Sequence, residues 1–386
     1  MTSGEQIPFN KPYLTGRETD YIIEAVESGK ISGNGLFTHK CQAFLREAFG
    51  FRKCLLTTSC TDALEMAAIL LNIGPEDEVI MPAYTFVSTA NAFVLRGARI
   101  VFADSMDSHP NMDVSKLESL ITNKTKVIVP VHYAGVACDM DEIMGIAEKH
   151  NLWVVEDAAQ AIDSFYTGRD GVRKPLGSIG HLAAFSFHET KNIISGEGGM
   201  LVVNDEQFEK RAEIIWEKGT NRSAFFRGEV DKYGWVDIGS SFLPSEIVAA
   251  FLFAQLEHIT EIQEKRRTLW NAYEAALQPL VASGRISIPL LPAYASNNAH
   301  MFYVVLASEA QRSKLIAALK QEDILAVFHY IGLHSSPYYA AKHDGRVLNN
   351  CDHFTDCLLR LPMFCELEIV DVNRICAIVT EVLNND

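Results

Sequence analysis

From residue 54 onward, short apolar runs alternate with longer segments whose apolar residues recur at the three- and four-residue spacing of a helix. The runs predict strands buried on both faces, and the segments predict amphipathic helices. This alternation is typical of an α/β fold with a large, mostly parallel sheet covered by helices on both faces. The expected strands are Cys54–Leu56, Val79–Met81, Arg99–Ala103, Val127–Val131, Leu152–Val155, Phe185–Phe187 and Met200–Val203. The expected helices are Thr61–Leu71, Val87–Leu95, Val114–Ile121 and Met140–Lys149.

The pattern changes after about residue 240. A long helical stretch from Pro244 to about Leu280 leads into a region where strands and helices are fewer. We therefore expect a large α/β domain over residues 1–255 and a smaller C-terminal α+β domain over residues 256–386. Residues 1–40 are expected to form an N-terminal arm that could pack with the smaller domain. The elements expected in that domain are Met301–Leu306, Arg312–Gln321, Leu325–Tyr330 and Asp371–Leu383.

Composition excludes several classes of protein. Hydrophobic residues make up 48% and charged residues 22% of the 386 positions, which is globular composition rather than that of a disordered chain. The formal net charge of −15 leaves no long-range basic field that would attract nucleic acid or an anionic membrane. The longest clearly apolar stretch near the centre, Ile247–Ala254, is far shorter than the roughly 18 residues of a membrane span.

The termini and cysteines indicate a cytoplasmic protein. The first residues contain an acid and no apolar stretch of the kind that a signal peptide requires. The 8 cysteines form no C-x-x-C pair and no zinc-ligand spacing, so we expect reduced thiols and no metal site. His132, His329 and His334 are candidate pocket residues, but they too lack metal-ligand spacing.

Candidate chemistry follows the predicted strands, because ligands in open α/β sheets bind beyond the carboxyl ends of the strands. After Cys54–Leu56, the residues Ser59, Cys60 and Thr61 open a helix. Hydroxyl groups and free N–H groups at a helix N-terminus can bind a phosphate. The alternative is that Ser59 or Thr61 only caps the helix.

Two other strand ends carry an acid and a lysine. Asp157 follows Leu152–Val155 and precedes small residues that allow a flat group to approach, although it could instead be a capping or solvated acid. Lys191 lies in a polar loop before Gly196–Gly199. A partly buried lysine can lose its proton and form a Schiff base, whereas most lysines are solvated surface residues.

The three features together match the requirements of pyridoxal 5′-phosphate. An acid keeps the pyridine nitrogen protonated, a lysine holds the aldehyde, and a helix N-terminus holds the phosphate. Phe86 follows Val79–Met81 and could stack on the ring face. Other motifs are weak: Gly33–Thr38 lacks the third glycine and the preceding strand of a dinucleotide fingerprint, and neither a Walker lysine motif nor a nucleophile elbow is present.

These residues resemble the sugar-nucleotide aminotransferases of the DegT/StrS type, which have the fold-type-I pyridoxal-phosphate architecture. The resemblance extends nearly from end to end of the chain. It implies a homodimer with shared active sites and, as partners, a nucleotide-linked keto-sugar and L-glutamate. The segments that carry it are Ile7–Asn10, Thr57–Thr61, Met81–Asn91, Val129–Gly135, Glu156–Ala161, Ser186–Gly199 and Phe328–Tyr330.

The resemblance implies a role for each cofactor-binding candidate. Lys191 is then the Schiff-base lysine and the acid/base of the proton shift, Asp157 pairs with the pyridine nitrogen, and Gln160 reaches the phenolic oxygen of the ring. Many relatives carry Gly-Tyr-Asn-Tyr, whose asparagine reaches the phosphate in the neighbouring subunit. This chain has Gly239–Phe242 instead, where Ser241 could be a shorter substitute. The remaining implied contacts are stacking by Phe86 and phosphate binding by Ser59, Cys60, Thr61 and Ser186.

Three segments resemble a narrower group of the family: Ser186–Asn192, Glu217–Ser223 and Asn298–Tyr303. That group uses L-glutamate to aminate C4 of dTDP-4-keto-6-deoxyglucose, giving the dTDP-4-amino-4,6-dideoxygalactose of enterobacterial common antigen. The alternatives are a different keto-sugar, such as the 3-keto isomer, and a non-catalytic protein with the same fold. A sugar dehydratase of the same superfamily would have a histidine in place of Lys191.

Substrate binding is expected from two further places. The segment Asn221–Trp235 is rich in basic and aromatic residues and too polar for a core, so Arg222, Arg227 and Tyr233 are candidates to bind a nucleotide phosphate. An ordinary solvated loop is the alternative. His329 and Tyr330 lie where the family places groups that face the sugar. Because the surface is acidic, a local basic pocket must offset the field that repels a dianionic sugar nucleotide.

Overall fold

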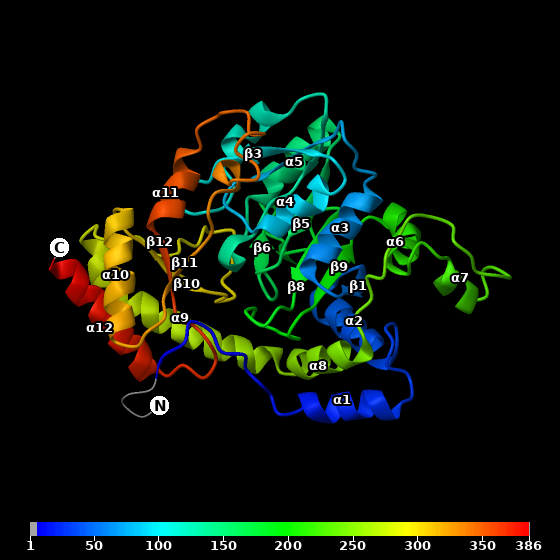
Figure 1. The fold of residues 1–386 in the computed structure, drawn as a ribbon, viewed down its shortest axis with the longest axis horizontal. Coiled ribbons are helices and arrows are strands. Elements are labelled where there is room, and N and C mark those ends of the chain that lie inside the picture. Colours follow the sequence, from blue (N-terminus) through cyan, green and yellow to red (C-terminus); the bar gives the residue numbers. More distant parts are fainter. Residues whose placement is uncertain (1–5, 386) are drawn as a thin grey trace.

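Seven strands form one central sheet in the order β1-β9-β8-β5-β4-β2-β3 (Figure 1). The computed structural model describes residues 6–385. Neighbouring strands from β8 to β3 are parallel, whereas β9 runs antiparallel to both β1 and β8. The predicted α/β fold with a mostly parallel sheet is confirmed. The strands are β1 (Lys53–Thr57), β2 (Glu78–Pro82), β3 (Arg99–Ala103), β4 (Thr125–Ile128), β5 (Trp153–Asp157), β8 (Leu182–Ser186) and β9 (Gly199–Val203).

Alternate residues of these strands belong to separate cores on the two faces of the sheet. Leu55 and Met81 pack in one core, whereas Leu56 and Ile80 pack in the other. Both faces are buried, which is why the strands are apolar throughout. The helices of the first face are α3 (Cys60–Leu70), α4 (Val87–Val94) and α6 (Glu209–Trp216), and those of the second are α2 (Leu36–Phe49), α5 (Met140–His150) and α8 (Glu246–Glu257).

A second sheet, antiparallel and in the order β10-β12-β11, carries the C-terminal part of the chain. Its core is a third hydrophobic cluster, shared with the helices that pack beside it. The long helical stretch predicted from Pro244 to about Leu280 is confirmed, but it consists of two helices that meet at His258, whose backbone is not helical. The elements are β10 (Phe302–Val305), β11 (Val327–Phe328), β12 (Leu358–Leu361), α9 (Ile259–Ala282), α10 (Glu309–Gln321), α11 (Asn349–Cys357) and α12 (Ile369–Asn384).

The N-terminal arm contacts both parts of the molecule. Ile7 forms a bridge with Ile324 and is buried in the C-terminal core. Farther along, α1 (Glu18–Glu27) packs along α8, below it in Figure 1, so this helix lies against the large domain instead of the smaller one. The division of the chain near residue 255 stays a prediction.

The sheet register brings the predicted site to one edge. Gly199, the first residue of β9, pairs with Thr57 at the end of β1 and with Ser186 at the end of β8. Asp157, at the end of β5, pairs with Ala184 of β8. The carboxyl ends of β1, β8 and β5 therefore lie side by side, and the loops that follow them share one region of the surface.

Candidate active site

The N-terminus of α3 forms a cradle for an anion. The Ser59 hydroxyl caps the helix by accepting a hydrogen bond from the Asp62 N–H at 3.1 Å. A Cβ atom at Gly199 would overlap the Ser59 carbonyl and the Cys60 nitrogen, so only glycine lets β9 approach this helix end. Among the described residues, no acceptor binds the N–H groups of Cys60 and Thr61. Free N–H groups at the positive end of a helix dipole suit a phosphate.

Asp157 is held rigidly beside this cradle. Its backbone N–H donates to the Pro130 carbonyl at 2.9 Å. The Thr89 hydroxyl donates to Oδ2 of Asp157 at 2.7 Å, and the Ala159 N–H donates to Oδ1 at 3.1 Å. Burial raises the pKa of Asp157 despite these hydrogen bonds. A protonated ring nitrogen placed against the carboxylate would compensate for that burial, which is what the predicted role requires.

The neighbouring acid, Glu156, is fully buried and saturated with hydrogen bonds. Its carboxylate accepts from three backbone N–H groups of the 177–180 turn and from Nε2 of His132 at 2.9 Å. His132 Nδ1 accepts from the Cys138 N–H, so its proton lies on Nε2. Burial alone would raise the pKa of Glu156, but these hydrogen bonds outweigh it and lower the pKa. His132 and Glu156 thus anchor the end of β5, whereas Asp157 faces the site.

Lys191 lies in the loop between β8 and β9 and is partly accessible. Among the described residues, none accepts a hydrogen bond from its ammonium or pairs with it as an ion. Burial is the largest cause that lowers the pKa of Lys191, and the positive charge of Arg360 acts in the same direction, while Asp157 and Cys60 oppose both. An unpartnered amine with a lowered pKa can act as a nucleophile.

The residue after Lys191 fixes the loop to the C-terminal part of the chain. Asn192 is buried and donates to Gln263 Oε1 and to the Asn298 carbonyl, both at 2.8 Å. Its amide oxygen lies 2.8 Å from Nδ1 of His300. The loop that carries Lys191 is therefore held against α9 and the segment before β10, which restricts the position of the amine.

Gln160 and two aromatic residues line the neighbouring space. Gln160 Oε1 accepts from the Ala134 N–H at 2.6 Å, and its Nε2 donates to the Tyr330 hydroxyl at 3.1 Å. Phe86 is 54% exposed at the start of α4, and its ring centroid is 6.1 Å from that of Tyr330. An open aromatic face next to Asp157 and Lys191 fits a flat cofactor ring.

A cluster of buried tyrosines and one histidine closes the site from the C-terminal side. Nδ1 of His329 lies 2.8 Å from the Tyr133 hydroxyl, and the Tyr84 hydroxyl donates to the His329 carbonyl. Burial, with the charges of Arg360 and Lys191, lowers the pKa of His329 well below its usual value, so the ring is neutral. Sequence reasoning missed Arg360. The signal was an arginine within the apolar run Leu358–Leu361.

The other predicted substrate residues lie elsewhere, on an arm that we define as residues 221–238. Arg227 pairs with Glu213 at 2.9 Å and with Glu229 at 2.7 Å. Arg222 stacks over the Phe226 ring. The contacts of both arginines in the described chain are with the arm and α6, not with the pocket around Lys191. Ser241, a predicted cofactor contact, lies just after the arm and forms an isolated bridge with Glu217. Figure 1 shows α7 (Arg222–Phe226) projecting from the body of the molecule.

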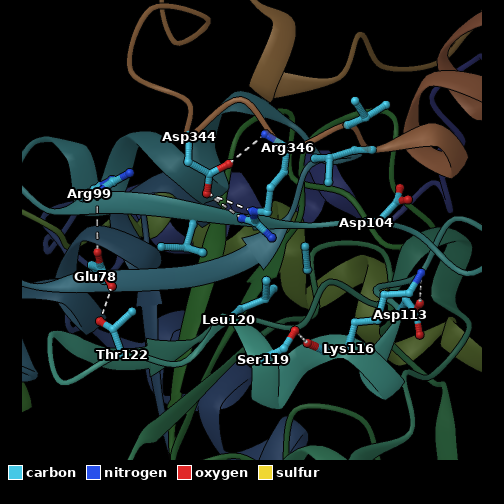
Figure 2. Close-up of a pocket in the computed structure, with 14 residues that line it drawn as sticks. Glu78, Arg99, Asp104, Asp113, Lys116, Ser119, Leu120, Thr122, Asp344 and Arg346 are labelled. Atoms are coloured by element: carbon cyan, nitrogen blue, oxygen red, sulfur yellow. Dashed lines mark hydrogen bonds and ion pairs between the residues drawn. The ribbon is translucent and has the colours of Figure 1, made fainter.

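A cleft lies in a different place. It has a volume of about 510 Å³ and lies along the edge strand β3, next to residues 344–348 (Figure 2). Charges of both signs line it, and Arg346 and Lys116 pair with Asp344 and Asp113. Because each of the three cations in the lining pairs with an acid of the same chain, the cleft offers no free positive charge to an anionic substrate.

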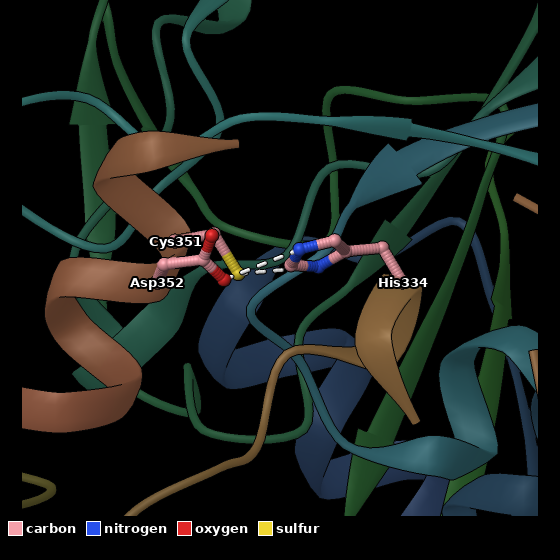
Figure 3. Close-up of side chains that lie close together, drawn as sticks. All are labelled: His334, Cys351 and Asp352. Carbon is pink, nitrogen blue, oxygen red and sulfur yellow. Dashed lines mark hydrogen bonds and ion pairs between the residues drawn. The ribbon is translucent and has the colours of Figure 1, made fainter. Parts of the chain in front are cut away.

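His334, Cys351 and Asp352 also lie close together (Figure 3). Nε2 of His334 is 3.2 Å from the Asp352 carboxylate, whereas Nδ1 of the same ring faces the Cys351 sulfur at 3.9 Å. Because Asp352 and Cys351 contact different nitrogens of the His334 ring, the three side chains do not converge on one point where a metal ion would lie. Burial raises the pKa of Cys351, which disfavours the thiolate that a metal would need.

No helix among residues 6–385 is long and apolar enough to cross a membrane.

Residues 12–380 match the family described as DegT/DnrJ/EryC1/StrS aminotransferase. The GDP-perosamine synthase of Caulobacter vibrioides is 33% identical over 99% of this chain and 100% of its own. The UDP-4-amino-4-deoxy-L-arabinose–oxoglutarate aminotransferase of Shewanella sediminis is 30% identical with the same coverage. Among solved structures, the PLP form of Spr1654 from Streptococcus pneumoniae, assigned as a sugar aminotransferase, has a TM-score of 0.89 and 26% identity, covering 99% of both chains.

Proposed function

Because the chain belongs to the DegT/DnrJ/EryC1/StrS aminotransferase family and uses pyridoxal 5′-phosphate, we propose that it aminates C4 of dTDP-4-keto-6-deoxyglucose with L-glutamate as donor. The product is then dTDP-4-amino-4,6-dideoxygalactose, a precursor of cell-surface glycan such as enterobacterial common antigen. One observation carries the aminotransferase chemistry: an unpartnered Lys191 amine lies on the same sheet edge as a buried Asp157 and a helix end with free N–H groups.

The proposed substrates are inferred from the similarity of this chain to its relatives. The name of the Shewanella relative joins a 4-amino sugar nucleotide with oxoglutarate, which is the keto acid left when glutamate gives up its amino group. The name of the Caulobacter relative contains a different nucleotide, so dTDP is supported by the narrower resemblance of segments such as Ser186–Asn192. All eight cysteines lie unbridged, which supports a reducing compartment and hence the cytoplasm.

When bound, pyridoxal phosphate supplies an aldehyde and an electron-withdrawing ring. The residues of this chain do the rest. The N–H groups of Cys60 and Thr61, with the hydroxyls of Ser59 and Ser186, hold the phosphate. Asp157, fixed by Thr89, accepts a hydrogen bond from the ring nitrogen and keeps it protonated.

Lys191 moves the proton. Its Nζ atom would hold the cofactor aldehyde and, when free of it, would accept the proton that leaves the amino-bearing carbon and donate it again on the cofactor side of the nitrogen. The lowered pKa favours the unprotonated amine that a base requires. The tyrosines and the neutral His329 exclude water from the site and orient the hexose through polar contacts.

We further propose a homodimer in which the arm of one subunit reaches the pocket of the other. The arm exposes large apolar side chains, with Trp235 85% and Phe226 69% exposed, which a monomer rarely leaves in water. It also carries Arg222 and Arg227, which in this arrangement bind the nucleotide diphosphate.

The test is a substrate comparison. Purified enzyme with pyridoxal phosphate is incubated with L-glutamate and one keto-sugar at a time, and the product is identified by NMR. The dTDP-linked 4-keto-6-deoxyglucose should react fastest and yield the galacto amine. Faster turnover of the 3-keto isomer, or of a GDP- or UDP-linked 4-keto sugar, would overturn the substrate assignment and leave the aminotransferase assignment standing.

A further inference from the structure

Arg360 lies in the middle of β12, the central strand of the small sheet, opposite Tyr303 of β10 and Val327 of β11. Side chains alternate along a strand, and Leu359 and Leu361 point into the C-terminal core. Leu358 points the other way and belongs to the core of the large domain. Arg360 therefore shares the face of β12 that looks toward the large domain and the pocket.

The guanidinium of Arg360 makes few hydrogen bonds within the described chain. Its only hydrogen bond within the described residues is a long one, 3.4 Å from Nη2 to the Phe328 carbonyl. Its Nε atom is buried without a partner, and the cation lies 4.5 Å from the centroid of the Phe9 ring. Two other arginines of the same domain, Arg312 and Arg374, each pair with a glutamate. An arginine carries five donors, so most of those of Arg360 are free for a ligand.

The surroundings of Arg360 are neutral, which leaves the pocket with excess positive charge. Tyr84, Tyr133 and Tyr330 act on the Arg360 cation, and burial keeps the pKa of each hydroxyl raised and hence protonated. Arg360 in turn contributes to the lowered pKa of Lys191, so the two cations lie within electrostatic reach of each other. Asp157 is the acid that faces Lys191. A pocket with two such cations and one acid favours an anionic ligand.

We propose that Arg360 binds a carboxylate of the amino donor. This inference rests on the proposed function, which names a dicarboxylic amino acid as donor. A planar guanidinium with unused donors matches a carboxylate in two parallel hydrogen bonds. In an amino acid the α-carboxylate is bonded to the carbon that reacts, so its partner must lie near Lys191. In a sugar nucleotide the hexose ring separates C4 from the diphosphate, so a phosphate-binding group lies farther away.

The experiment separates the two substrates of the holoenzyme. Glutarate is a dicarboxylate without an amino group, so it binds without reacting, and calorimetry gives its dissociation constant. The same method gives the dissociation constant of dTDP. The two half-reactions are followed by the cofactor absorbance, with L-glutamate in one direction and with the amino-sugar nucleotide in the other.

For Arg360→Gln we expect glutarate binding and the KM for glutamate to weaken roughly 10- to 100-fold, because a charge-assisted pair is lost. Affinity for dTDP and the sugar half-reaction should stay within roughly twofold. Arg360→Lys keeps the positive charge but cannot form two parallel hydrogen bonds to a carboxylate, so glutarate binding and the KM for glutamate should weaken less than in Arg360→Gln. Arg312→Gln is the matched control, since Arg312 also has an unpartnered Nε and binds a backbone carbonyl. It should change the dissociation constant of neither glutarate nor dTDP.

Each outcome decides the matter. Unchanged glutarate binding in Arg360→Gln, or a loss confined to dTDP, overturns the proposal, and the second result would assign Arg360 to the diphosphate. Wild-type enzyme that neither responds to glutamate nor binds glutarate refutes the donor named in the proposed function and this inference together. If the wild type responds to glutamate and Arg360→Gln binds glutarate as tightly as the wild type does, only this inference is refuted.

Discussion

The pocket around Lys191 and the arm of residues 221–238 both carry predicted site residues, but the chain treats them differently. In the pocket, Asp157 and Asn192 are buried and hydrogen-bonded on several sides. In the arm, Trp235 and Phe226 project into water, and Arg227 is satisfied by acids of its own neighbourhood. The groups expected to hold the cofactor come from one chain and are packed within it, whereas the arm leaves large apolar side chains exposed.

This difference assigns catalysis to the pocket around Lys191 and suggests a role in subunit contacts for the arm. Groups that transfer protons must be held within fractions of an ångström, and the strand ends of a packed sheet provide that precision. Groups that bind a nucleotide can lie on a mobile or shared element, since phosphate recognition by arginine tolerates adjustment. Mutations in the two regions should therefore fail in different ways.

The largest effect is expected for Lys191→Ala. Without the amine, no group of the pocket can exchange the cofactor aldehyde or carry the proton, so turnover should fall roughly 10⁴-fold or more. Borohydride reduction of the wild type, followed by peptide mapping, should place the pyridoxyl group on Lys191. A pyridoxyl group on any other lysine would contradict the assignment. Because the ammonium has no partner, the variant should melt no lower than the wild-type apoprotein.

Asp157→Asn should have the second largest effect. The amide supplies no charge, so the ring nitrogen loses its proton and can only accept a hydrogen bond from the asparagine NH2 group. We expect cofactor to remain bound while turnover falls about 10³-fold, or about 4 kcal/mol in the barrier. Thr89→Val, which removes the hydrogen bond to Oδ2 and the one between the Thr85 and Thr89 hydroxyls, should reduce turnover much less. Turnover near that of the wild type in Asp157→Asn would refute the proposed role.

The third prediction tests the arm. Arg222→Ala/Arg227→Ala should raise the KM for the sugar nucleotide roughly 10-fold or more and leave the glutamate half-reaction unchanged, since the phosphate contacts are lost. Arg173→Ala, an exposed arginine outside the arm, is the control. Light scattering should show a dimer for the wild type, and a monomer with full activity would contradict shared sites.

Mixing the first and third variants decides which pocket the arm serves. A subunit with Lys191→Ala keeps its arm, and a subunit with Arg222→Ala/Arg227→Ala keeps its lysine. If the arm serves the neighbour, refolded mixtures contain dimers with one complete site and should recover about a quarter of wild-type activity. If the arm serves its own pocket, no mixed dimer has a complete site and no activity returns.

Much of the pocket is predictable from sequence because its residues follow apolar runs that are easy to recognise. Asp157 and Lys191 each lie just past such a run, and parallel strands bring their ends together. Arg360 could not be placed in this way. It reaches the pocket from a strand of the other sheet, and only the packing of two domains shows which face of β12 it takes. The break between α8 and α9 was missed because both sides of His258 have helical spacing.

The smallest effect expected concerns the pH dependence of stability. Burial, with nearby positive charges, lowers the pKa of His300 and His329 well below 6.5, so both stay neutral in the folded protein. The unfolded chain takes up their protons near pH 6.5. Their contribution to stability is therefore complete above pH 6.5 and is lost as the pH falls toward the lower folded values. Asp157 acts in the opposite direction, because its pKa is raised: its contribution to stability is complete below the unfolded pKa of 3.8 and is lost as the pH rises through the folded pKa.

Urea unfolding of the apoprotein at about pH 7 and about pH 5.5 measures this effect, and a variant compared at the same two pH values isolates the contribution of one histidine. The wild type should lose stability on acidification, and His329→Gln, which cannot take up a proton, should lose less. His353→Gln, on the exposed face of α11, is the matched control and should follow the wild type. An equal loss in His329→Gln and the wild type would show that His329 is not held neutral. The arm, which has no buried histidine, should not contribute to this dependence, so Arg222→Ala/Arg227→Ala should unfold with the wild-type pH profile.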